Sequence, residues 1–261
     1  MEPYKPLSRS IRGHTAIITG AASGMGRATA HLFASEGANV AVTELDEAAC
    51  QAVVDEIAKR GFDTARAWAL DVSDASAISQ VVEEVAEAFG GLDILVNNAG
   101  FGAFVSPDED EKYELIWEKS LAVMLSAHQR MIRAALPYLR RSQNPRIVNV
   151  ASTEGLGATP GNSPYVAAKH GVIGLTRGMA ADLGKEGITV NCICPGPIRT
   201  GITQAIPEEH KEIYARRRTA LRRYGIPEEV ANMTLSVVLP AASFLTGAII
   251  PVDGGLVVRN A

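Results

Sequence analysis

The sequence predicts an α/β protein built on a single, doubly wound parallel sheet with helices on both faces. Two patterns lead to this prediction. Apolar runs of five or six residues alternate along the chain with longer stretches that have helical periodicity. The runs are continuously apolar, as is typical of parallel strands that are buried on both faces. With 261 residues, of which 47% are hydrophobic, the chain is large enough for a sizeable core.

The elements follow one another in a regular order. We expect strands at 14–19, 38–43, 65–70, 92–97, 146–151, 189–193 and 248–252. We expect helices at 24–36, 47–60, 75–89, 111–141, 163–183 and 228–239. Helices that connect parallel strands make right-handed crossovers, which gives a doubly wound sheet. The polar segment 200–225 interrupts the alternation and is expected to be a lid or substrate loop.

Composition limits the domain organisation and the partners. Residues 1–12 have no apolar core segment and are expected to be a tail, followed by one domain over 13–261. A net charge of −4 argues against nucleic acid as a partner. The apolar stretch 233–252 contains Pro240 and Pro251, so a buried helix and strand fit better than a membrane span. We therefore expect a cytoplasmic protein.

Three cysteines are too few and too irregularly spaced for a disulfide framework. Cys192 and Cys194 alternate with Ile193 in a strand-like run, while Cys50 stands alone. A metal pair would need further Cys or His ligands, and the sequence suggests none. We expect these cysteines to behave as small buried hydrophobic residues, and we expect no metal site.

A glycine-rich turn lies between the first strand and the first helix. Its candidate cofactor-binding residues are Gly20, Ser23, Gly24, Met25 and Gly26. Glycines allow a tight turn and a close approach of the backbone to a pyrophosphate. The helix that follows offers free N–H groups and the positive end of its dipole to an anion. This position in the chain favours a nucleotide-binding turn over an ordinary one.

Glu44, at the end of the second strand, bears on the choice of dinucleotide. Its carboxylate can accept hydrogen bonds from both ribose hydroxyls and would repel a 2′-phosphate. Ser23 and Leu45 offer no cation for such a phosphate, and Arg27 lies inside the first helix. We therefore predict NAD rather than NADP. The alternative is that Glu44 is only a solvated strand end.

Two further strand ends carry candidate cofactor contacts. Asp71 and Val72 follow the third strand and could contact adenine, although Asp71 also suits a turn. Asn98, Ala99 and Gly100 follow the fourth strand, at the carboxyl edge where ligands bind such sheets. A purely structural role for an asparagine here is the alternative.

Tyr165 and Lys169 suggest acid–base chemistry. They are four residues apart, so they project from the same face of the predicted helix 163–183. A cation beside a phenol lowers its pKa, and such a tyrosine can exchange a proton with an alcohol or a carbonyl. Ser152 stands thirteen residues upstream of Tyr165, at a strand end. The alternative to a catalytic role is that Ser152 is only a turn residue at a strand end and that the Tyr165 hydroxyl lies in solvent.

Together, these motifs resemble the short-chain dehydrogenase/reductase family over residues 12–255. The resemblance includes the 165–169 segment Tyr-Val-Ala-Ala-Lys, the 195–200 segment that begins Pro-Gly-Pro and the final Val-Asp-Gly-Gly of 252–255. It implies a seven-stranded Rossmann-type sheet, a nicotinamide cofactor and a homotetramer built on helices 111–141 and 163–183. It also implies cofactor contacts from Tyr165, Lys169, Pro195, Gly196, Ile198 and Thr200.

The resemblance implies a mechanism in which Tyr165 exchanges the proton while hydride passes between carbon and the nicotinamide. Ser152 would donate a hydrogen bond to the reacting oxygen, and Lys169 would hold the ribose and lower the pKa of Tyr165. Family members usually carry an asparagine seven residues after a tryptophan. Here Trp117 is followed at that spacing by Met124, so water and backbone, or Ser120 and His128, would have to replace the amide.

The substrate is predicted to be a secondary alcohol or its ketone, apolar or cyclic. Candidate substrate-binding residues are Ser152, Glu154, Phe101, Phe104, Leu156 and Tyr165. One alternative is reduction of 3-oxoacyl groups on an acyl carrier protein, against which Glu44 weighs because that reaction usually uses NADPH. Another is a non-catalytic NAD-binding sensor or scaffold, which only Met124 supports.

Overall fold

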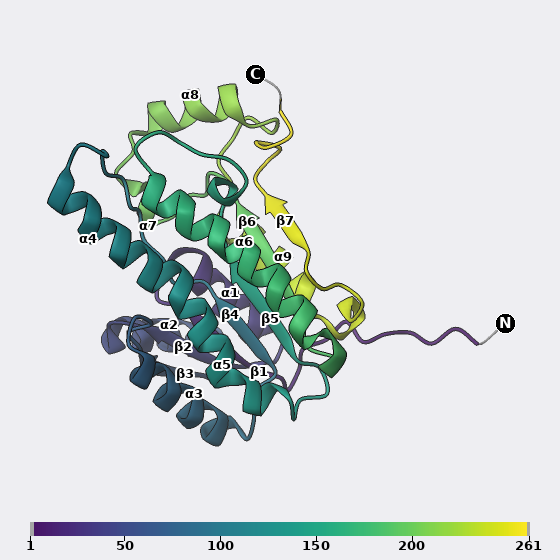
Figure 1. The fold of residues 1–261 in the computed structure, drawn as a ribbon. Helices are drawn as coiled ribbons and strands as arrows, with labels where there is room; N and C mark the ends of the chain where they lie inside the picture. Colours follow the sequence, from purple (N-terminus) through teal and green to yellow (C-terminus); the bar gives the residue numbers. More distant parts are fainter. Residues whose placement is uncertain (1–2, 260–261) are drawn as a thin grey trace.

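The computed structural model describes residues 3–259 and shows one seven-stranded parallel sheet (Figure 1). The strand order is β3-β2-β1-β4-β5-β6-β7, so the chain winds outward from β1 in both directions. The strands are β1 (Thr15–Thr19), β2 (Asn39–Glu44), β3 (Ala65–Ala69), β4 (Ile94–Asn97), β5 (Arg146–Val150), β6 (Thr189–Pro195) and β7 (Ile249–Val252). The predicted doubly wound α/β fold is therefore confirmed.

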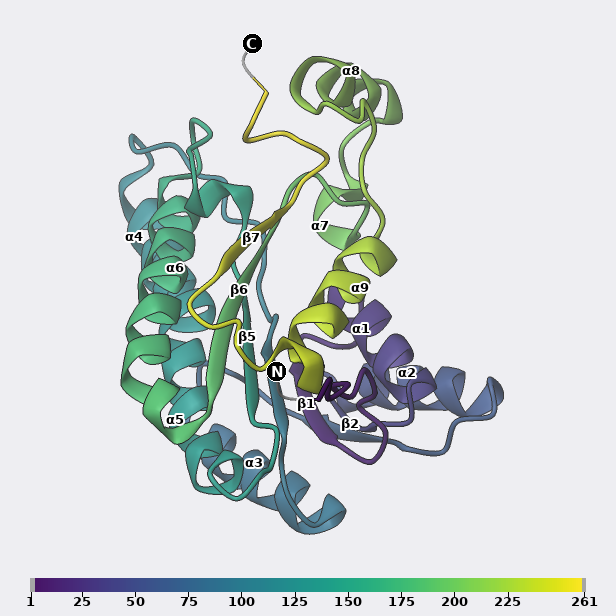
Figure 2. The ribbon, with the colours of Figure 1, turned by 90° about the vertical axis from the view of Figure 1, so that its right-hand side faces the viewer.

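Helices cover both faces of the sheet (Figure 2). One face carries α1 (Gly24–Ser35), α2 (Glu47–Lys59) and α9 (Pro227–Val238). The other carries α3 (Ala75–Phe89), α5 (Ala127–Leu139) and α6 (Ser163–Leu183), and α4 (Asp110–Leu121) packs against α6. Among residues 3–259, no helix combines the length and the apolar character that crossing a bilayer requires.

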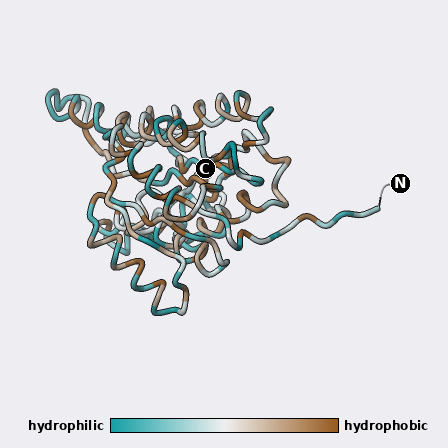
Figure 3. The backbone as a smooth tube through the Cα atoms, turned by 90° about the horizontal axis from the view of Figure 1, so that it is seen from below, coloured by the Kyte–Doolittle hydropathy of each residue, from teal (hydrophilic) through white to brown (hydrophobic). Residues whose placement is uncertain are grey.

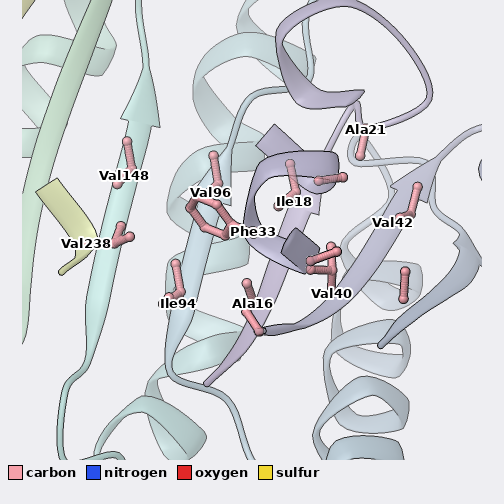
Figure 4. Packing of buried hydrophobic residues seen from close by; sticks show 14 of the residues in the cluster. Ala16, Ile18, Ala21, Phe33, Val40, Val42, Ile94, Val96, Val148 and Val238 are labelled. Carbon is pink, nitrogen blue, oxygen red and sulfur yellow. The ribbon is translucent and has the colours of Figure 1, made fainter. Parts of the chain in front are cut away.

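Each face of the sheet has its own apolar core. On the α1 side, Phe33 packs over the strands, close to Ile18 and Val96 (Figure 4). The central strands β1, β4 and β5 are buried along their whole length, as their continuously apolar sequences predict. The cysteines are free and buried, as expected. A rigid centre of this kind holds the carboxyl ends of the strands, where ligands bind, in fixed positions.

Two predicted segments differ in detail from the structure. The helix expected at 111–141 is a continuous rod of α4, the π-helical turn η1 (Ala122–Ser126) and α5, because one extra residue is accommodated at the bulge. The polar segment 200–225 contains α7 (Gly201–Gln204) and α8 (Glu208–Arg218), and α8 lies beyond the carboxyl ends of the strands (Figure 1). Residues 3–10 extend away from the body, exposed to solvent (Figure 3).

Candidate active site

The glycine-rich turn between β1 and α1 is tightly packed. Gly20 has a φ of +66°, and a Cβ there would come within 2.8 Å of the Ala99 Cα atom. A Cβ on Gly26 would overlap the Gly20 carbonyl oxygen. The Asn98 amide donates to the carbonyl oxygens of Thr19 (2.9 Å) and Gly20 (3.1 Å). Asn98 thus holds the turn from the neighbouring strand, and side chains are excluded where a pyrophosphate would approach.

Gly26→Ala is expected to lower the free energy of unfolding by about 1–3 kcal/mol, because its Cβ would meet backbone that cannot move aside. Because the distorted turn would also bind the pyrophosphate less well, the variant should lose affinity for NAD. Urea unfolding and cofactor titration measure the two effects. Gly184→Ala is the matched control, since a Cβ at that exposed position has open space. Equal stability of the two variants would contradict the tight packing.

The amino end of α1 is suited to an anion. Ser23 is the N-cap residue, yet its side chain makes no capping hydrogen bond, and the first turn contains no acidic residue. Its first N–H groups are therefore left for a ligand. Thr200 lies across from this turn, with its Cγ2 atom 3.3 Å from the place of a Cβ on Gly24. These features fit the pyrophosphate of a dinucleotide.

A cavity of about 430 Å³ lies between the residues that follow β2 and β3 and the rod of α4 and η1, and its size suits an adenine ring. Its lining combines apolar side chains with Asp71, which follows β3. The lining residues are Leu45, Asp71, Ser73, Leu115, Glu118, Lys119, Ala122 and Val123. The Asp71 carboxylate also accepts hydrogen bonds from Ser73, so it closes a turn as well as facing the cavity. Val72 is buried beside it.

Glu44 and Arg27 have separate partners. The Glu44 carboxylate accepts a hydrogen bond from the Leu45 N–H (2.9 Å) and stays at the strand end. The Arg27 guanidinium pairs with Glu56 of α2, at 2.6 Å. Because its charge is already matched there, Arg27 is not a free cation for a 2′-phosphate.

Ser152 is positioned by the turn that follows β5. It caps the short 3-10 helix η2 (Thr153–Gly155), and its hydroxyl accepts from the Glu154 N–H (3.1 Å). Gly155 lets this turn approach α6, since a Cβ there would lie 2.7 Å from the Lys169 carbonyl oxygen. As a result, the Ser152 hydroxyl is close enough to the Tyr165 phenol to lower its pKa through a hydrogen bond.

Tyr165 and Lys169 lie on the first turns of α6 and face the end of β5. The Lys169 ammonium is buried, donates to the Val150 carbonyl oxygen (2.9 Å) and lies 5.5 Å from the Tyr165 ring centroid. Burial lowers the pKa of Lys169 to about 8, although the nearby Cys192 and Cys194 act in the opposite direction. Ser152, Tyr165 and Lys169 thus converge at the carboxyl end of β5, as the sequence analysis anticipates.

The pKa of Tyr165 does not follow the sequence-based expectation. Burial is the main cause that raises it, to about 12; the Ser152 hydrogen bond acts in the opposite direction, and the Glu154 carboxylate acts in the same direction as burial. The Lys169 ammonium donates to the Val150 carbonyl oxygen. In the protein by itself, desolvation therefore dominates the pKa of Tyr165.

The segment 200–225 lies beyond the carboxyl ends of the strands (Figure 1). Ile202 of α7 meets the β4 loop, where a Cβ on Gly102 would lie 3.4 Å from its Cγ2 atom. From α8, Tyr214 lies close enough to Glu154 for that carboxylate to raise its pKa, although burial is the larger cause. The segment 200–225 therefore approaches both the loop after β4 and the turn after β5.

The predicted substrate residues fall into two groups. Phe104 (66% exposed) and Leu156 (41% exposed) leave apolar surface open in the loops after β4 and β5, and the Lys119 ammonium lies 5.0 Å from the Phe101 ring centroid. The Glu154 carboxylate, in contrast, accepts hydrogen bonds from the Thr159 N–H (2.8 Å) and hydroxyl (2.7 Å). Glu154 thus closes its own loop, which favours a structural role over binding a hydroxyl or amine.

The segment after β6 is also held by close packing. A Cβ on Gly196 would lie 2.7 Å from the Asp253 Cα atom, and the Gly196 N–H donates to the Val252 carbonyl oxygen at 3.0 Å. Pro195 ends β6 and is buried. The Ile198 side chain is buried against Gly225, so a cofactor contact from Ile198 would involve its backbone.

Comparison with known proteins agrees with this geometry. A family model described as Enoyl-(Acyl carrier protein) reductase matches residues 20–257. The 3-oxoacyl-(acyl-carrier-protein) reductase FabG of Thermotoga maritima is 38% identical over 251 residues, which cover 95% of this chain and 99% of that protein. The chain belongs to the short-chain dehydrogenase/reductase family.

Other members of this family include enzymes with different substrates. The meso-2,3-butanediol dehydrogenase of Serratia marcescens is 38% identical, with 92% of each chain covered. A solved dehydrogenase/reductase from Sinorhizobium meliloti 1021 is 39% identical, with a TM-score of 0.89 and coverage of 95% and 97%. The protein is therefore an oxidoreductase that acts on CH–OH groups or their carbonyls with a nicotinamide cofactor.

Met124 is where this short-chain dehydrogenase/reductase departs from the usual pattern. Its side chain is fully buried in η1 and packs in an apolar cluster with Ala103 and Ala168, against which Tyr165 also packs. The thioether sulfur lies 3.5 Å from the place of a Cβ on Gly100. Met124 thus fills the space beside the tyrosine without offering a strong hydrogen-bonding group.

Two residues near the site are not among those that the sequence analysis names. Gly155 permits the close approach of η2 to α6, and the only sequence signal for it is a glycine three residues after Ser152. Tyr214 comes from the polar segment 200–225, where its place opposite Glu154 depends on how α8 folds back.

Proposed function

We propose that this protein is an NAD-dependent dehydrogenase or reductase of secondary alcohols and ketones in which Tyr165 is the proton-transfer group. The observation that carries the proposal is the convergence of Ser152, Tyr165 and Lys169 at the carboxyl end of β5, next to the glycine turn. A phenol, a hydroxyl donor and a buried cation at one point suit the interconversion of an alcohol and a carbonyl.

Each side chain has a distinct task. The Tyr165 hydroxyl takes the alcohol proton or returns it to the carbonyl, and the Ser152 hydroxyl donates to the same substrate oxygen. A bound oxidised nicotinamide supplies the hydride acceptor and a positive charge. Because the Tyr165 pKa is about 12 in the protein itself, nearby positive charge is needed for the phenol to ionise near neutral pH. Lys169 holds its ammonium in place through the Val150 carbonyl.

Glu44 and the pairing of Arg27 support NAD over NADP. Glu44→Ala is expected to lower kcat/KM for NAD about tenfold to a hundredfold, because ribose hydroxyls would lose hydrogen bonds to a charged group. The same change should raise kcat/KM for NADP, since the repulsion of a 2′-phosphate is removed. Steady-state kinetics with both cofactors measure the shift. Equal use of NAD and NADP by the wild type, unchanged in the variant, would count against this assignment.

Exposed apolar side chains in the loops around the site support an apolar or cyclic substrate. Phe104, Leu156 and Tyr214 expose apolar surface there, and the Glu154 carboxylate is already occupied by Thr159. A panel of secondary alcohols, ring diols and ketones, assayed through the absorbance of reduced cofactor, tests the proposal. Turnover of none of them, with NAD bound, would refute it and support the sensor or scaffold alternative.

Reduction of 3-oxoacyl groups on an acyl carrier protein is the second candidate. It is favoured by the match to the Thermotoga maritima reductase. A 3-oxoacyl carrier substrate in the same panel separates the two functions.

We further propose a homotetramer whose contacts are made by the α4–η1–α5 rod and α6, as the family resemblance implies.

A further inference from the structure

A group of buried polar side chains lies near Lys169, on α5 and at the end of β4. His128 of α5 is almost fully buried, and neither ring nitrogen has a partner at hydrogen-bond geometry. Asn97, the last residue of β4, is also buried and leaves its Oδ1 atom without a partner. Buried polar atoms without partners are rare in folded proteins and often mark the place of an ordered water.

His128 lies near both Lys169 and Asn149. The Lys169 ammonium is near enough to affect its ring, and so is the Asn149 amide. Asn149 is itself held on both sides: its Oδ1 accepts from Asn97 (2.9 Å), and its Nδ2 donates to Thr176 (3.0 Å). The next residue of β5 is Val150, whose carbonyl accepts from Lys169. The polar groups from β4 to α6 therefore form one connected region.

The protonation state of His128 is well defined. Burial and, to a smaller extent, the Lys169 ammonium together lower its pKa to about 3, against a weaker opposing effect of the Asn149 side chain. The ring is therefore a neutral imidazole at neutral pH, with one nitrogen that donates and one that accepts. A neutral ring of this kind can accept from a water that in turn accepts from an ammonium.

Neither Met124 nor Ser120 explains this arrangement. Met124 packs in the apolar cluster with Ala103 and Ala168, and a thioether is a weak acceptor. Ser120, one turn before Met124, is also buried with its hydroxyl unpartnered, but a hydroxyl on α4 is a single small group. Of the two polar neighbours of Met124 along the rod, His128 is the one that has two unpartnered ring nitrogens and lies near the Lys169 ammonium.

We propose that His128 is a positioning residue that holds a buried water against the Lys169 ammonium, in place of the asparagine amide that Met124 replaces. This inference rests on the proposed function, because it concerns the path by which a proton moves between Lys169 and the interior. The water accepts a hydrogen bond from Lys169 and donates one to the neutral imidazole, and the Asn97 Oδ1 atom is a second acceptor within the same polar region.

His128→Leu tests the proposal, because leucine fills a buried site without a hydrogen-bonding atom. We expect kcat to fall about tenfold, as for the loss of one hydrogen bond to a charged group, with KM for the alcohol and Kd for NAD unchanged. Adding Met124→Asn to His128→Leu should restore most of the lost kcat, because the amide again provides a partner for the water. The same Met124→Asn change in the wild-type background should have little effect.

A matched control is His14→Leu. The His14 Nδ1 atom is likewise buried without a partner, but it lies just before β1, at the amino ends of the strands. We expect His14→Leu to keep the kcat of the wild type. A fall in its kcat would show that removing any buried imidazole lowers activity. His128→Gln, which retains a donor and an acceptor, should keep more activity than His128→Leu and covers the case in which the leucine variant does not fold.

Several results would overturn the inference. An unchanged kcat in His128→Leu together with a raised melting temperature would show that the ring is merely an unsatisfied core residue. If Met124→Asn raised kcat by the same factor in the wild type and in His128→Leu, the two positions would act independently. A crystal structure of the wild type that shows no water between Lys169 and His128 would refute it even if no substrate turns over, whereas failure of turnover alone would refute the proposed function.

Discussion

Tyr165→Phe is expected to lower kcat by about 10²–10⁴-fold, the range for loss of a positioned acid or base. The change removes one oxygen from a side chain that packs beside Met124 and Ala168, so the ring and its packing remain. Cofactor affinity should therefore change little. Single-turnover and steady-state measurements with NAD and the best alcohol of the panel would give the effect on chemistry and on binding separately.

Tyr138→Phe provides the matched control for this experiment. Tyr138 lies near the carboxyl end of α5, next to the amino ends of the strands and far from Ser152. Its loss of a hydroxyl should leave kcat unchanged. Full activity of Tyr165→Phe would show that the convergence of Ser152, Tyr165 and Lys169 has no catalytic meaning, and it would favour a binding protein.

Lys169→Met is expected to lower kcat/KM by at least about a hundredfold, because it removes the only buried cation that reaches the end of β5 among residues 3–259. The effect on stability should have a different sign at different pH values. Methionine removes the cost of burying an ammonium, but the Val150 carbonyl loses its donor, a cost of about 1–3 kcal/mol. Near pH 7, the relief from burying a charge raises the free energy of unfolding of the variant, and the unpaired Val150 carbonyl lowers it.

The pH dependence of stability separates the two contributions. The pKa of Lys169 falls from its ordinary value of 10.5 to about 8 in the folded protein. Between these values the unfolded chain binds more protons than the folded one, so the folded wild type gains stability as pH rises. One pKa unit corresponds to about 1.4 kcal/mol. Between pH 8 and pH 10.5, the free energy of unfolding of the wild type should therefore rise by about 3 kcal/mol relative to that of Lys169→Met.

Urea unfolding of the wild type and the variant between pH 7 and pH 10.5 measures this gain. All other titrating groups are common to both proteins, so the difference between the two curves reports on Lys169. Lys185→Met, a change at an exposed lysine after α6, should show no such divergence. Parallel curves for the wild type and Lys169→Met would mean that the ammonium is not desolvated.

The local patterns of the sequence were sufficient for the fold. Continuous apolar runs predict buried parallel strands, and their alternation with helices predicts the doubly wound sheet that the structure shows. The four-residue spacing of Tyr165 and Lys169 placed them on one face of α6 because helix geometry is set locally. The glycines of the first turn were likewise recognisable, since backbone contact there excludes a Cβ.

Other features depend on which residues packing brings together, and no local pattern contains that information. Helical periodicity did not show the π-helical turn at Met124 or the partner that Glu154 finds in Thr159. The spacing of Tyr165 and Lys169 suggested a lowered phenol pKa, yet burial raises it. His128 and Lys169 are far apart in the chain, and only the tertiary structure placed both in one desolvated region, where the cost of burying polar groups depends on the surroundings as a whole.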